Sequence, residues 1–441
     1  MNLRRLFSYL ILTLSITACG GSSGGGDSSP QSSDITAVIR GYLPADCSVT
    51  EQNRFIYDIM RDPYFWRADV PALNYASYPS PEAVLEALRP QKDIYSYIRS
   101  AADVENSNAE VAVGIGVRFM FIGGGIYLSH VYEGSPAYTA GLRRGNRIIN
   151  VNGWQAENIA SSSQLSDILG ETAAGVQVSV TYLDADSVQH SAVITKTQFH
   201  TPSINNVSVF ADALSGKKTG YFSYDFFGSS LGEVLTALSY LRSENINYLI
   251  MDLRANGGGS VNMAVILASA FAGREHIGKR LLTGRFNPSY PDIAYKIMDT
   301  GHDFVLEKIV FITSGGTASA SEILINTLKP YRNVSIIGTT TYGKPVSSMP
   351  TKFCDKYFYP IVFENLNSLG QGRYYTGMQP DCTFYEDYTA MKEYGDEDEQ
   401  LLAAAMDYTL NGICQPSAPS SAERAKAEKV PYTDLLTNRV W

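Results

Sequence analysis

Strand-like and helix-like segments alternate along the second half of the chain, and this alternation constrains the fold more than any other feature. From residue 217 to about 415 the segments read KTGYFSY, LGEVLTALSYLRSE, INYLIMDLR, SVNMAVILASAFAG, KIVFIT, SASEILINTLKP and NVSIIG. Such alternation is typical of an α/β layer with a buried sheet. The apolar run YLIM indicates a strand covered on both faces. We therefore predict an α/β core over residues 200–415, followed by a polar tail at 416–441.

Two regions of different character precede this core. Residues 48–108 are predicted to be a helical region, because apolar residues recur there at three- and four-residue spacing and Ser80 before Pro81 is a helix-capping pattern. The apolar residues are Phe55, Ile56, Ile59 and Met60. Residues 109–199 contain short β-type runs punctuated by glycine, which predicts a separate small β domain.

The first residues predict export from the cytoplasm. Arg4 and Arg5 precede an apolar run of about ten residues, which is too short for a permanent membrane helix and is typical of a signal peptide, here residues 1–18. The sequence ITAC matches a lipobox, so Cys19 is expected to be lipidated, with plain secretion as the alternative.

A lipid on Cys19 predicts a lipoprotein attached to the membrane. Gly20 stands where an aspartate would signal inner-membrane retention, so we expect an outer-membrane lipoprotein that faces the periplasm or the cell surface. Residues 19–47, which begin with a Gly/Ser-rich stretch, are predicted to be a flexible tether. The net charge of −9 gives no basic patch for nucleic acid.

Four further cysteines predict two disulfides in an oxidising compartment. Three connectivities are possible, and we expect Cys354 to pair with Cys382 and Cys47 with Cys414. Four buried thiols are the alternative.

The stretch GGTASASEIL, residues 315–324, contains the first candidate for catalysis. Ser319 with Glu322 three residues later forms a capping box, and a helix cap alone would explain this serine. The preceding strand KIVFIT and the small-residue turn, however, predict a strand–turn–helix elbow. There the hydroxyl of Ser319 and the backbone N–H of Ala320 would face the same space, as a nucleophile and half of an oxyanion hole.

A second candidate lies in IMDLRANGGGSV. The three glycines at 257–259 permit backbone conformations with positive φ and close approach of a ligand, although a tight strand-to-helix connection would also need them. A phosphate loop is not indicated, because no GK[ST] follows.

The base for a serine nucleophile could be a lysine. None of the five histidines lies in a run that marks a catalytic triad. Lys344 follows a predicted buried strand in IIGTTTYGKP, and burial could lower a lysine pKa from about 10.4 to around 7 or 8. A surface lysine is the alternative interpretation.

Two resemblances bring these motifs together. GSPAYTAGLRRGNRIINVNG is similar to the PDZ domains of bacterial proteases. IMDLRANGGG, GGTASASEIL, GTTTYGKP and GMQPDCTF occur in the order found in the C-terminal processing peptidases, or tail-specific proteases, and the resemblance covers about residues 50–412. It implies a multidomain α/β (α+β) protein with a crotonase/Clp-protease-like core, an inserted PDZ domain and a Ser/Lys dyad.

The resemblance also implies the role of each site residue. Ser319 would be the nucleophile, Lys344 the general base, and the N–H groups of Ala320 and of Gly258 or Gly259 the oxyanion donors. No metal, nucleotide or other cofactor is required.

The sequence departs from the family pattern near the lysine. Ser348 stands where the family usually has a glutamine that positions the lysine, and Ser347 or Ser348 could replace its hydrogen bond. Pro345 replaces a glycine, and Gly257 replaces a proline.

The PDZ-like segment predicts how substrates are selected. Its groove would bind a C-terminal carboxylate through backbone N–H groups of GIGV, at Gly114, Ile115, Gly116 and Val117. Expected partners are unfolded proteins or proteins with exposed C-termini, and an activating lipoprotein is left open. Two alternative functions remain: a lipoprotein on this fold that binds peptides or apolar ligands without cleaving them, and a thioester hydrolase or hydratase.

Overall fold

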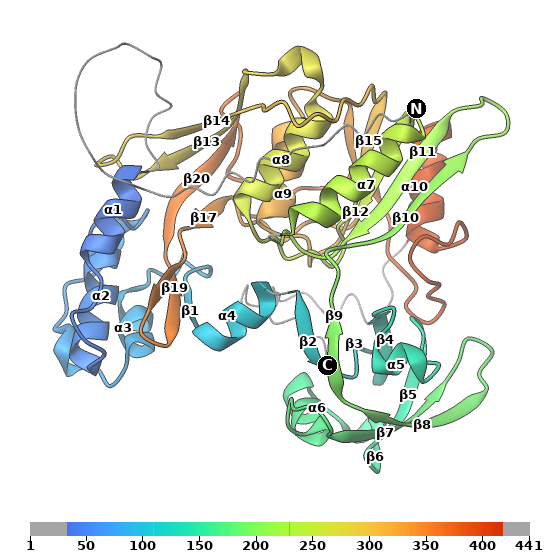
Figure 1. The fold of residues 1–441 in the computed structure, drawn as a ribbon, viewed down its shortest axis with the longest axis horizontal. Helices are drawn as coiled ribbons and strands as arrows, with labels where there is room; N and C mark the ends of the chain where they lie inside the picture. The colour runs from blue at the N-terminus through green and yellow to red at the C-terminus, as the bar shows by residue number, and fades with distance from the viewer. Residues whose placement is uncertain (1–32, 109, 229, 418–441) are drawn as a thin grey trace, which may run out of the picture. The chain divides into compact units, whose positions relative to one another are not determined.

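The computed structural model describes residues 33–108, 110–228 and 230–417 (Figure 1). The predicted signal peptide, Cys19, the first part of the predicted tether and residues 418–441 of the predicted tail lie outside these ranges. Over the described ranges, no helix is long and apolar enough to cross a membrane.

A six-stranded sheet lies at the centre of the core. All neighbouring strands are parallel except the first pair, β10 and β11, which are antiparallel. In spatial order the strands are β10 (Ile204–Ala211), β11 (Lys218–Tyr224), β12 (Tyr248–Asp252), β15 (Lys308–Thr313), β16 (Val334–Gly338) and β21 (Cys382–Thr383).

Helices cover both faces of this sheet. Figure 1 shows α7, α8 and α9 side by side over one face, while α10 packs on the other. Their bounds are α7 (Leu231–Ser243), α8 (Val261–Ala272), α9 (Ala320–Leu328) and α10 (Gln400–Asn411). In β12, Leu249 and Met251 join the hydrophobic cluster under α7–α9, and Ile250 joins the cluster under α10. Side chains alternate along a strand, so a two-sided sheet requires the continuous apolar run YLIM. The predicted α/β core is confirmed.

Two smaller sheets extend the core toward the N-terminal region. One is antiparallel, in the order β14 (Ile293–Lys296), β13 (Arg280–Phe286), β20 (Ile361–Asn367) and β17 (Val346–Ser348). The other has the order β1 (Tyr97–Ser100), β19 (Lys356–Tyr359) and β18 (Thr351–Phe353). A short 3-10 turn, η4, covers Arg274–His276.

The N-terminal region is helical in its first part, as predicted. Its elements are α1 (Ser33–Gly41), α2 (Val49–Arg61), η1 (Arg67–Asp69), η2 (Tyr75–Ser77), α3 (Pro81–Leu88) and α4 (Ala101–Asn108). The four apolar residues predicted to share a face are all buried in α2, and the Ser80 hydroxyl accepts a hydrogen bond from Ala83 N–H. The region is not wholly helical, because β1 pairs with β19 of the core.

The predicted tether at 19–47 is wrong for its described part. Helix α1 lies there, and Ile35 and Ile39 are buried in the hydrophobic cluster that also contains Phe353 and Phe358. The two isoleucines stand four residues apart, so they face the same side of one helix and can pack against the core.

Residues 111–200 form a separate region that contains the segment similar to PDZ domains, called the PDZ region below. A sheet in the order β3, β4, β5, β7, β8 leaves β3 at an edge, and β6 pairs with β5. The strands are β3 (Val117–Ile122), β4 (Gly125–Val131), β5 (Arg147–Val151), β6 (Trp154–Gln155), β7 (Gln177–Leu183) and β8 (Gln189–Thr195), and the helical elements are α5 (Pro136–Thr139), η3 (Ala156–Asn158) and α6 (Ser162–Leu169). The chain enters through β2 (Val111–Gly114) and leaves through β9 (Thr197–His200), which pair with each other.

Two disulfides connect distant parts of the chain, but the expected pairing is wrong. Cys47 bonds to Cys354, and Cys382 bonds to Cys414. The first bridge joins the start of α2 to the β18–β19 turn, and the second joins β21 to the segment after α10. Sequence alone could not choose among the three connectivities, because each pair meets only through the tertiary fold.

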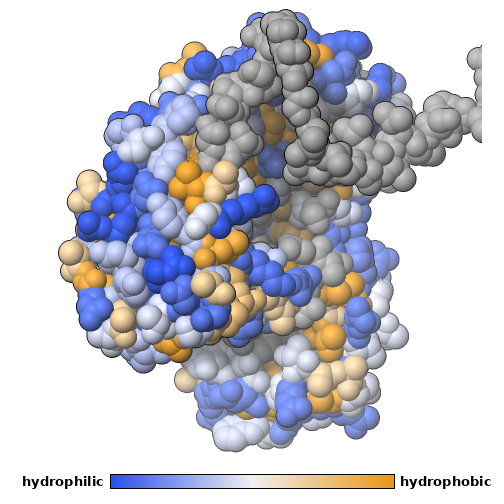
Figure 2. All heavy atoms as spheres, turned by 60° about the vertical axis from the view of Figure 1, so that its left-hand side comes forward, coloured by the Kyte–Doolittle hydropathy of each residue, from blue (hydrophilic) through white to orange (hydrophobic). Residues whose placement is uncertain are grey.

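Hydrophobic and hydrophilic side chains are interspersed on the face drawn in Figure 2. Scattered apolar residues of this kind are ordinary on a protein surface.

Candidate active site

Ser319 lies on a sharp turn between β15 and α9. Its backbone has φ 56° and ψ −115°, a conformation that residues other than glycine rarely adopt, and it is the N-cap of α9. Only 6% of the residue is exposed. Ser321, two residues further on in α9, donates its hydroxyl to the carbonyl of Asn256 at 3.0 Å and is fully buried. The predicted elbow therefore turns Ser319, and not Ser321, toward the site.

Glu322 connects this elbow to the loop that carries Lys344. Its Oε2 atom accepts the N–H of Ser319 at 2.9 Å and the N–H of Lys344 at 2.8 Å. Its Oε1 atom accepts the N–H of Gly343 at 2.7 Å and the hydroxyl of Thr341 at 2.6 Å. Burial raises the pKa of this carboxyl group, against the hydrogen bonds that lower it. Since all four partners donate, the site fits the ionised form.

Lys344 is buried, with 2% of its surface exposed. Loss of hydration lowers its pKa to about 7, while the charges of Asp93 and Glu322 oppose that shift. The preceding carbonyl, that of Gly343, accepts the hydroxyl of Tyr95 at 2.7 Å. The surface-lysine alternative is therefore wrong, and a buried lysine with a lowered pKa lies in the site.

Residues of the N-terminal region contribute to the surroundings of this lysine. The carboxylate of Asp93 accepts the backbone N–H groups of Tyr95 and Ser96, both at 2.9 Å, and the hydroxyl of Tyr64 at 2.6 Å. Sequence analysis missed Asp93 and Tyr95. Neither lies in a recognisable motif, and about 250 residues separate them from Lys344.

The glycine loop lies directly against Ser319. A Cβ atom on Gly258 would stand 2.7 Å from Ser319 Cβ and 3.0 Å from Ala320 N, so no other residue fits. The N–H of Gly258 donates to Asn256 Oδ1 at 2.9 Å. Over the described residues, the N–H groups of Gly259 and Ala320 donate to no protein acceptor. Of the two glycines predicted as donors, the geometry therefore favours Gly259.

Ser347 and Ser348 follow the lysine on β17. Ser347 is buried, and its hydroxyl exchanges hydrogen bonds with the side-chain amide of Asn365 at 2.9 and 3.1 Å. Ser348 is partly exposed and pairs in register with Ile361 of β20. Asn365 was not singled out from the sequence, but it binds Ser347 and donates its own N–H to the carbonyl of Pro345 at 2.8 Å.

One cavity of about 1660 Å³ brings most of the predicted residues together. Ser319, Lys344, Ser347, Ser348 and the glycines 257–259 line it. The PDZ region contributes Gly114 and Ile115, whereas Gly116 and Val117 are buried and do not line it.

Gly116 holds the PDZ loop in shape. Its φ is 87°, and a Cβ atom there would lie 2.1 Å from Ser135 Cβ. The carbonyl of Gly116 accepts the N–H of Tyr132, and that of Ile115 accepts the N–H of Ala137. These two hydrogen bonds anchor the loop to the segment that contains α5.

A buried cluster of charges lies behind the glycine loop. Arg254 forms two 2.8 Å hydrogen bonds with Glu399 and also contacts Asp252. Arg144 of the PDZ region bonds to Glu386 and to the carbonyl of Lys392. The motif IMDLR thus ends in an arginine that binds the segment preceding α10.

One cavity thus contains a serine on a strand–turn–helix elbow, a buried lysine and backbone N–H donors. These are the groups that a serine-type hydrolase needs. Comparisons with known proteins agree. Residues 218–383 match the model of peptidase family S41, residues 51–97 match the peptidase S41 N-terminal domain, and residues 103–181 match the PDZ domain.

Two curated relatives are similar over most of the chain. A probable CtpA-like serine protease of Staphylococcus aureus (strain N315) is 24% identical over 360 residues, which cover 79% of this chain and 67% of the relative. Its counterpart in Staphylococcus saprophyticus is 22% identical over 333 residues, covering 74% and 63%. The crystal structure of a protein from Bacteroides fragilis NCTC 9343 assigned to the S41 proteases shares the fold, with a TM-score of 0.66, 24% identity and coverage of 82% of this chain and 98% of that one.

The chain belongs to the C-terminal processing peptidases of family S41 and is a serine-type peptidase with a PDZ domain. The alternative of a non-cleaving binding protein is not favoured by these matches.

Proposed function

We propose that this peptidase cleaves proteins with a dyad of Ser319 and Lys344 and selects them by their C-termini. The main support for the dyad is the position of Glu322. Its Oε2 atom accepts hydrogen bonds from the backbone N–H groups of both Ser319 and Lys344. This contact keeps the two residues close, and burial supplies the lysine with the lowered pKa that a base needs.

The proposed reaction has two stages. Neutral Lys344 takes the proton of the Ser319 hydroxyl while the Oγ atom of Ser319 attacks the carbonyl carbon of the peptide bond. The N–H groups of Ala320 and Gly259 stabilise the oxyanion that forms. The lysine then gives this proton to the leaving amine, and an acyl-enzyme remains. A water molecule, deprotonated by the same lysine, hydrolyses the ester and frees Ser319.

Recognition of C-termini is supported by the form of the PDZ region. Strand β3 lies at a sheet edge, where an extended peptide can add as a further strand. The segment from Gly114 to Val117, which connects β2 to β3, would receive the terminal carboxylate, and two of its residues line the cavity of Ser319. A bound tail would thus lead into that cavity.

Attachment to the outer membrane through a lipid on Cys19 belongs to the same proposal. The two disulfides support an oxidising compartment, because such bonds are rare in the cytosol. Metabolic labelling with palmitate should mark the wild type and spare Cys19→Ala. Equal labelling of both proteins would refute lipidation at Cys19.

Cleavage of an unstructured protein with an apolar C-terminus tests the dyad. The full chain should cleave it, while Ser319→Ala and Lys344→Ala should not, and Ser321→Ala should remain active as the matched control. Amidation of the substrate's C-terminus should raise KM if a carboxylate is recognised. If no variant cleaves, labelling of Ser319 by a fluorophosphonate would indicate a latent enzyme awaiting an activator. Cleavage that survives Lys344→Ala would refute the dyad.

A further inference from the structure

Three side chains meet where the PDZ region joins the core. Glu110 stands immediately before β2, His200 ends β9, and Glu233 lies in the first turn of α7. One ligand atom from each side chain lies within 4.8 Å of the other two. The strand pairing accounts for part of this, because Val111 stands opposite His200 and the N–H of Thr201 donates to the carbonyl of Glu110.

Each carboxylate has one oxygen fixed by the protein and directs the other toward the imidazole. Glu233 Oε2 accepts the N–H and the hydroxyl of Ser203 at 2.8 and 2.9 Å, and its Oε1 lies 3.3 Å from His200 Nε2. Glu110 Oε1 accepts the N–H of Ser230 at 3.3 Å, and its Oε2 lies 3.9 Å from the same nitrogen. Second bonds of this kind orient metal ligands in proteins.

Glu110 gives a separate reason to expect a cation. Only 5% of the residue is exposed, and its Oε2 atom lies 3.9 Å from His200 Nε2. A largely buried carboxylate that lies close to a second carboxylate is costly unless a positive charge lies near both of them.

We propose that Glu110, His200 and Glu233 bind a divalent transition-metal ion, with Zn²⁺ as the best fit. Zinc takes imidazole nitrogen and carboxylate oxygen at about 2.0–2.2 Å in tetrahedral sites, which places ligand atoms about 3.4 Å apart. The distance between His200 Nε2 and Glu233 Oε1, 3.3 Å, already has this spacing. The distance between His200 Nε2 and Glu110 Oε2, 3.9 Å, must shorten by about half an ångström. Water would take the fourth position, since His200 is 56% exposed in its side chain.

The site would brace the PDZ region against the core. Its ligands come from the residue before the strand that enters the region, from the strand that leaves it and from helix α7. Gly228 lies against Glu110 Oε1, and the adjacent Phe227 accepts the N–H of Ser260 and donates to the carbonyl of Gly258. The Glu110 side chain thus connects the proposed site to the segment that holds the glycine loop. Its role is structural and does not depend on the proposed dyad.

Zinc binding to the full chain, stripped with EDTA, tests the site. Competition with a chromogenic chelator should show one Zn²⁺ per chain at micromolar zinc, and zinc should raise Tm. Loss of a second bond to a ligand costs about 10- to 100-fold in affinity, so His200→Ala and Glu233→Gln should each lose about 100-fold or more.

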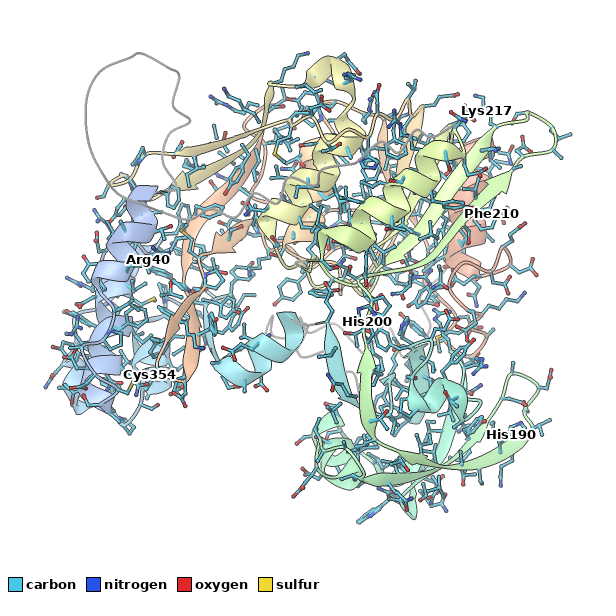
Figure 3. The ribbon with its side chains drawn as sticks, viewed as in Figure 1. Arg40, His190, His200, Phe210, Lys217 and Cys354 are labelled. Atoms are coloured by element: carbon cyan, nitrogen blue, oxygen red, sulfur yellow. A yellow bond between two sulfur atoms is a disulfide. The ribbon has the colours of Figure 1, made fainter. Side chains whose placement is uncertain are left out.

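His190→Ala is the matched control. His190 is also exposed and pairs with a single carboxylate, that of Asp184 at 2.7 Å, and Figure 3 shows it on the β7–β8 hairpin, apart from His200 on β9. This variant should bind zinc and gain Tm as the wild type does. Absence of zinc binding in the wild type, or equal affinity in His200→Ala and Glu233→Gln, would overturn the proposal. Circular dichroism without zinc verifies that each variant is folded. If His200→Ala does not fold, the zinc affinity of Glu233→Gln alone decides the test.

Discussion

The burial of Lys344 determines how activity should depend on pH. An ordinary lysine has a pKa near 10.4, whereas loss of hydration lowers that of Lys344 to about 7. The neutral amine is the base, so activity is lost as pH falls through 7 and is retained above it. We expect kcat/KM for a fluorogenic peptide to rise along one limb centred near pH 7 and then level off. A profile that is flat from pH 5 to 10, or a limb near pH 10, would contradict this prediction.

Asp93, in the N-terminal region, should influence the pH at which activity rises. Its negative charge favours the protonated lysine, so Asp93→Asn should move the limb to lower pH. The asparagine oxygen can still accept the two backbone N–H groups that Asp93 holds, which keeps the loop in place. Asp69→Asn, an exposed site in a surface ion pair, is the control. If the pH at which kcat/KM rises is the same in Asp93→Asn and the wild type, the charge of Asp93 does not affect the pKa of Lys344.

At this scale the sequence predicted residues that lie in motifs and missed those that do not. Ser319, Lys344 and the glycine loop do line one cavity, as their order along the family pattern implied. Asp93 could not be found, because its effect on Lys344 depends on a fold that brings distant segments together. Whether Ser319 and Lys344 perform the chemistry stays a prediction until the variants are assayed.

At the scale of elements, Glu322 joins helix α9 to the loop before β17. Each carboxylate oxygen of Glu322 accepts two hydrogen bonds. Glu322→Gln would replace one of these oxygens with an NH₂ group, which donates and therefore cannot accept the hydrogen bonds from the two donors that face it. Hydrogen bonds to charged groups contribute about 1.5–3 kcal/mol each, so we expect a loss of about 3 kcal/mol in the free energy of unfolding, measured in urea. Glu275→Gln, at an exposed carboxylate, should change it by less than about 0.5 kcal/mol. Equal stability of Glu322→Gln and the wild type would contradict this account.

Elements with a strong local pattern were predicted well, and pairings between distant elements were not. The continuous apolar run YLIM defined β12, and the capping residue Ser80 marked the start of α3. The pairing of β1 with β19 has no local signal, since residues 97–100 meet residues 356–359. Helix α1 was missed because the Gly/Ser stretch before it suggested that the flexible composition continued.

On the scale of the whole molecule, the buried charges hold the PDZ region and the core together. Arg144→Met would leave Glu386 without this partner, and breaking a buried ion pair costs about 3–5 kcal/mol. We expect a lower Tm and faster amide hydrogen exchange over residues 386–399. Arg143→Met is the matched control, because the hydrogen bonds of the Arg143 guanidinium go to the carbonyls of Tyr138 and Leu142 within the PDZ region. Unchanged exchange in Arg144→Met would mean that other contacts hold the two parts.

The order of regions along the chain followed from composition and motifs, but their interleaving did not. The hydrophobic cluster around α2 takes residues from both the N-terminal region and the core, such as Phe55 and Phe358. A sequence read from end to end suggests regions joined in series. The folded molecule instead places the first described helices against strands that come more than 250 residues later.

The bridge between Cys47 and Cys354 makes most of the molecule a covalent ring, with 307 residues of sequence separation between its ends. A single cut anywhere inside this ring, including the PDZ region, cannot separate the two fragments. Nicked molecules would migrate as one band on a denaturing gel without reductant and as two bands with it. A peptidase in contact with its own copies is exposed to such cuts, and the ring would let a nicked molecule keep all its parts.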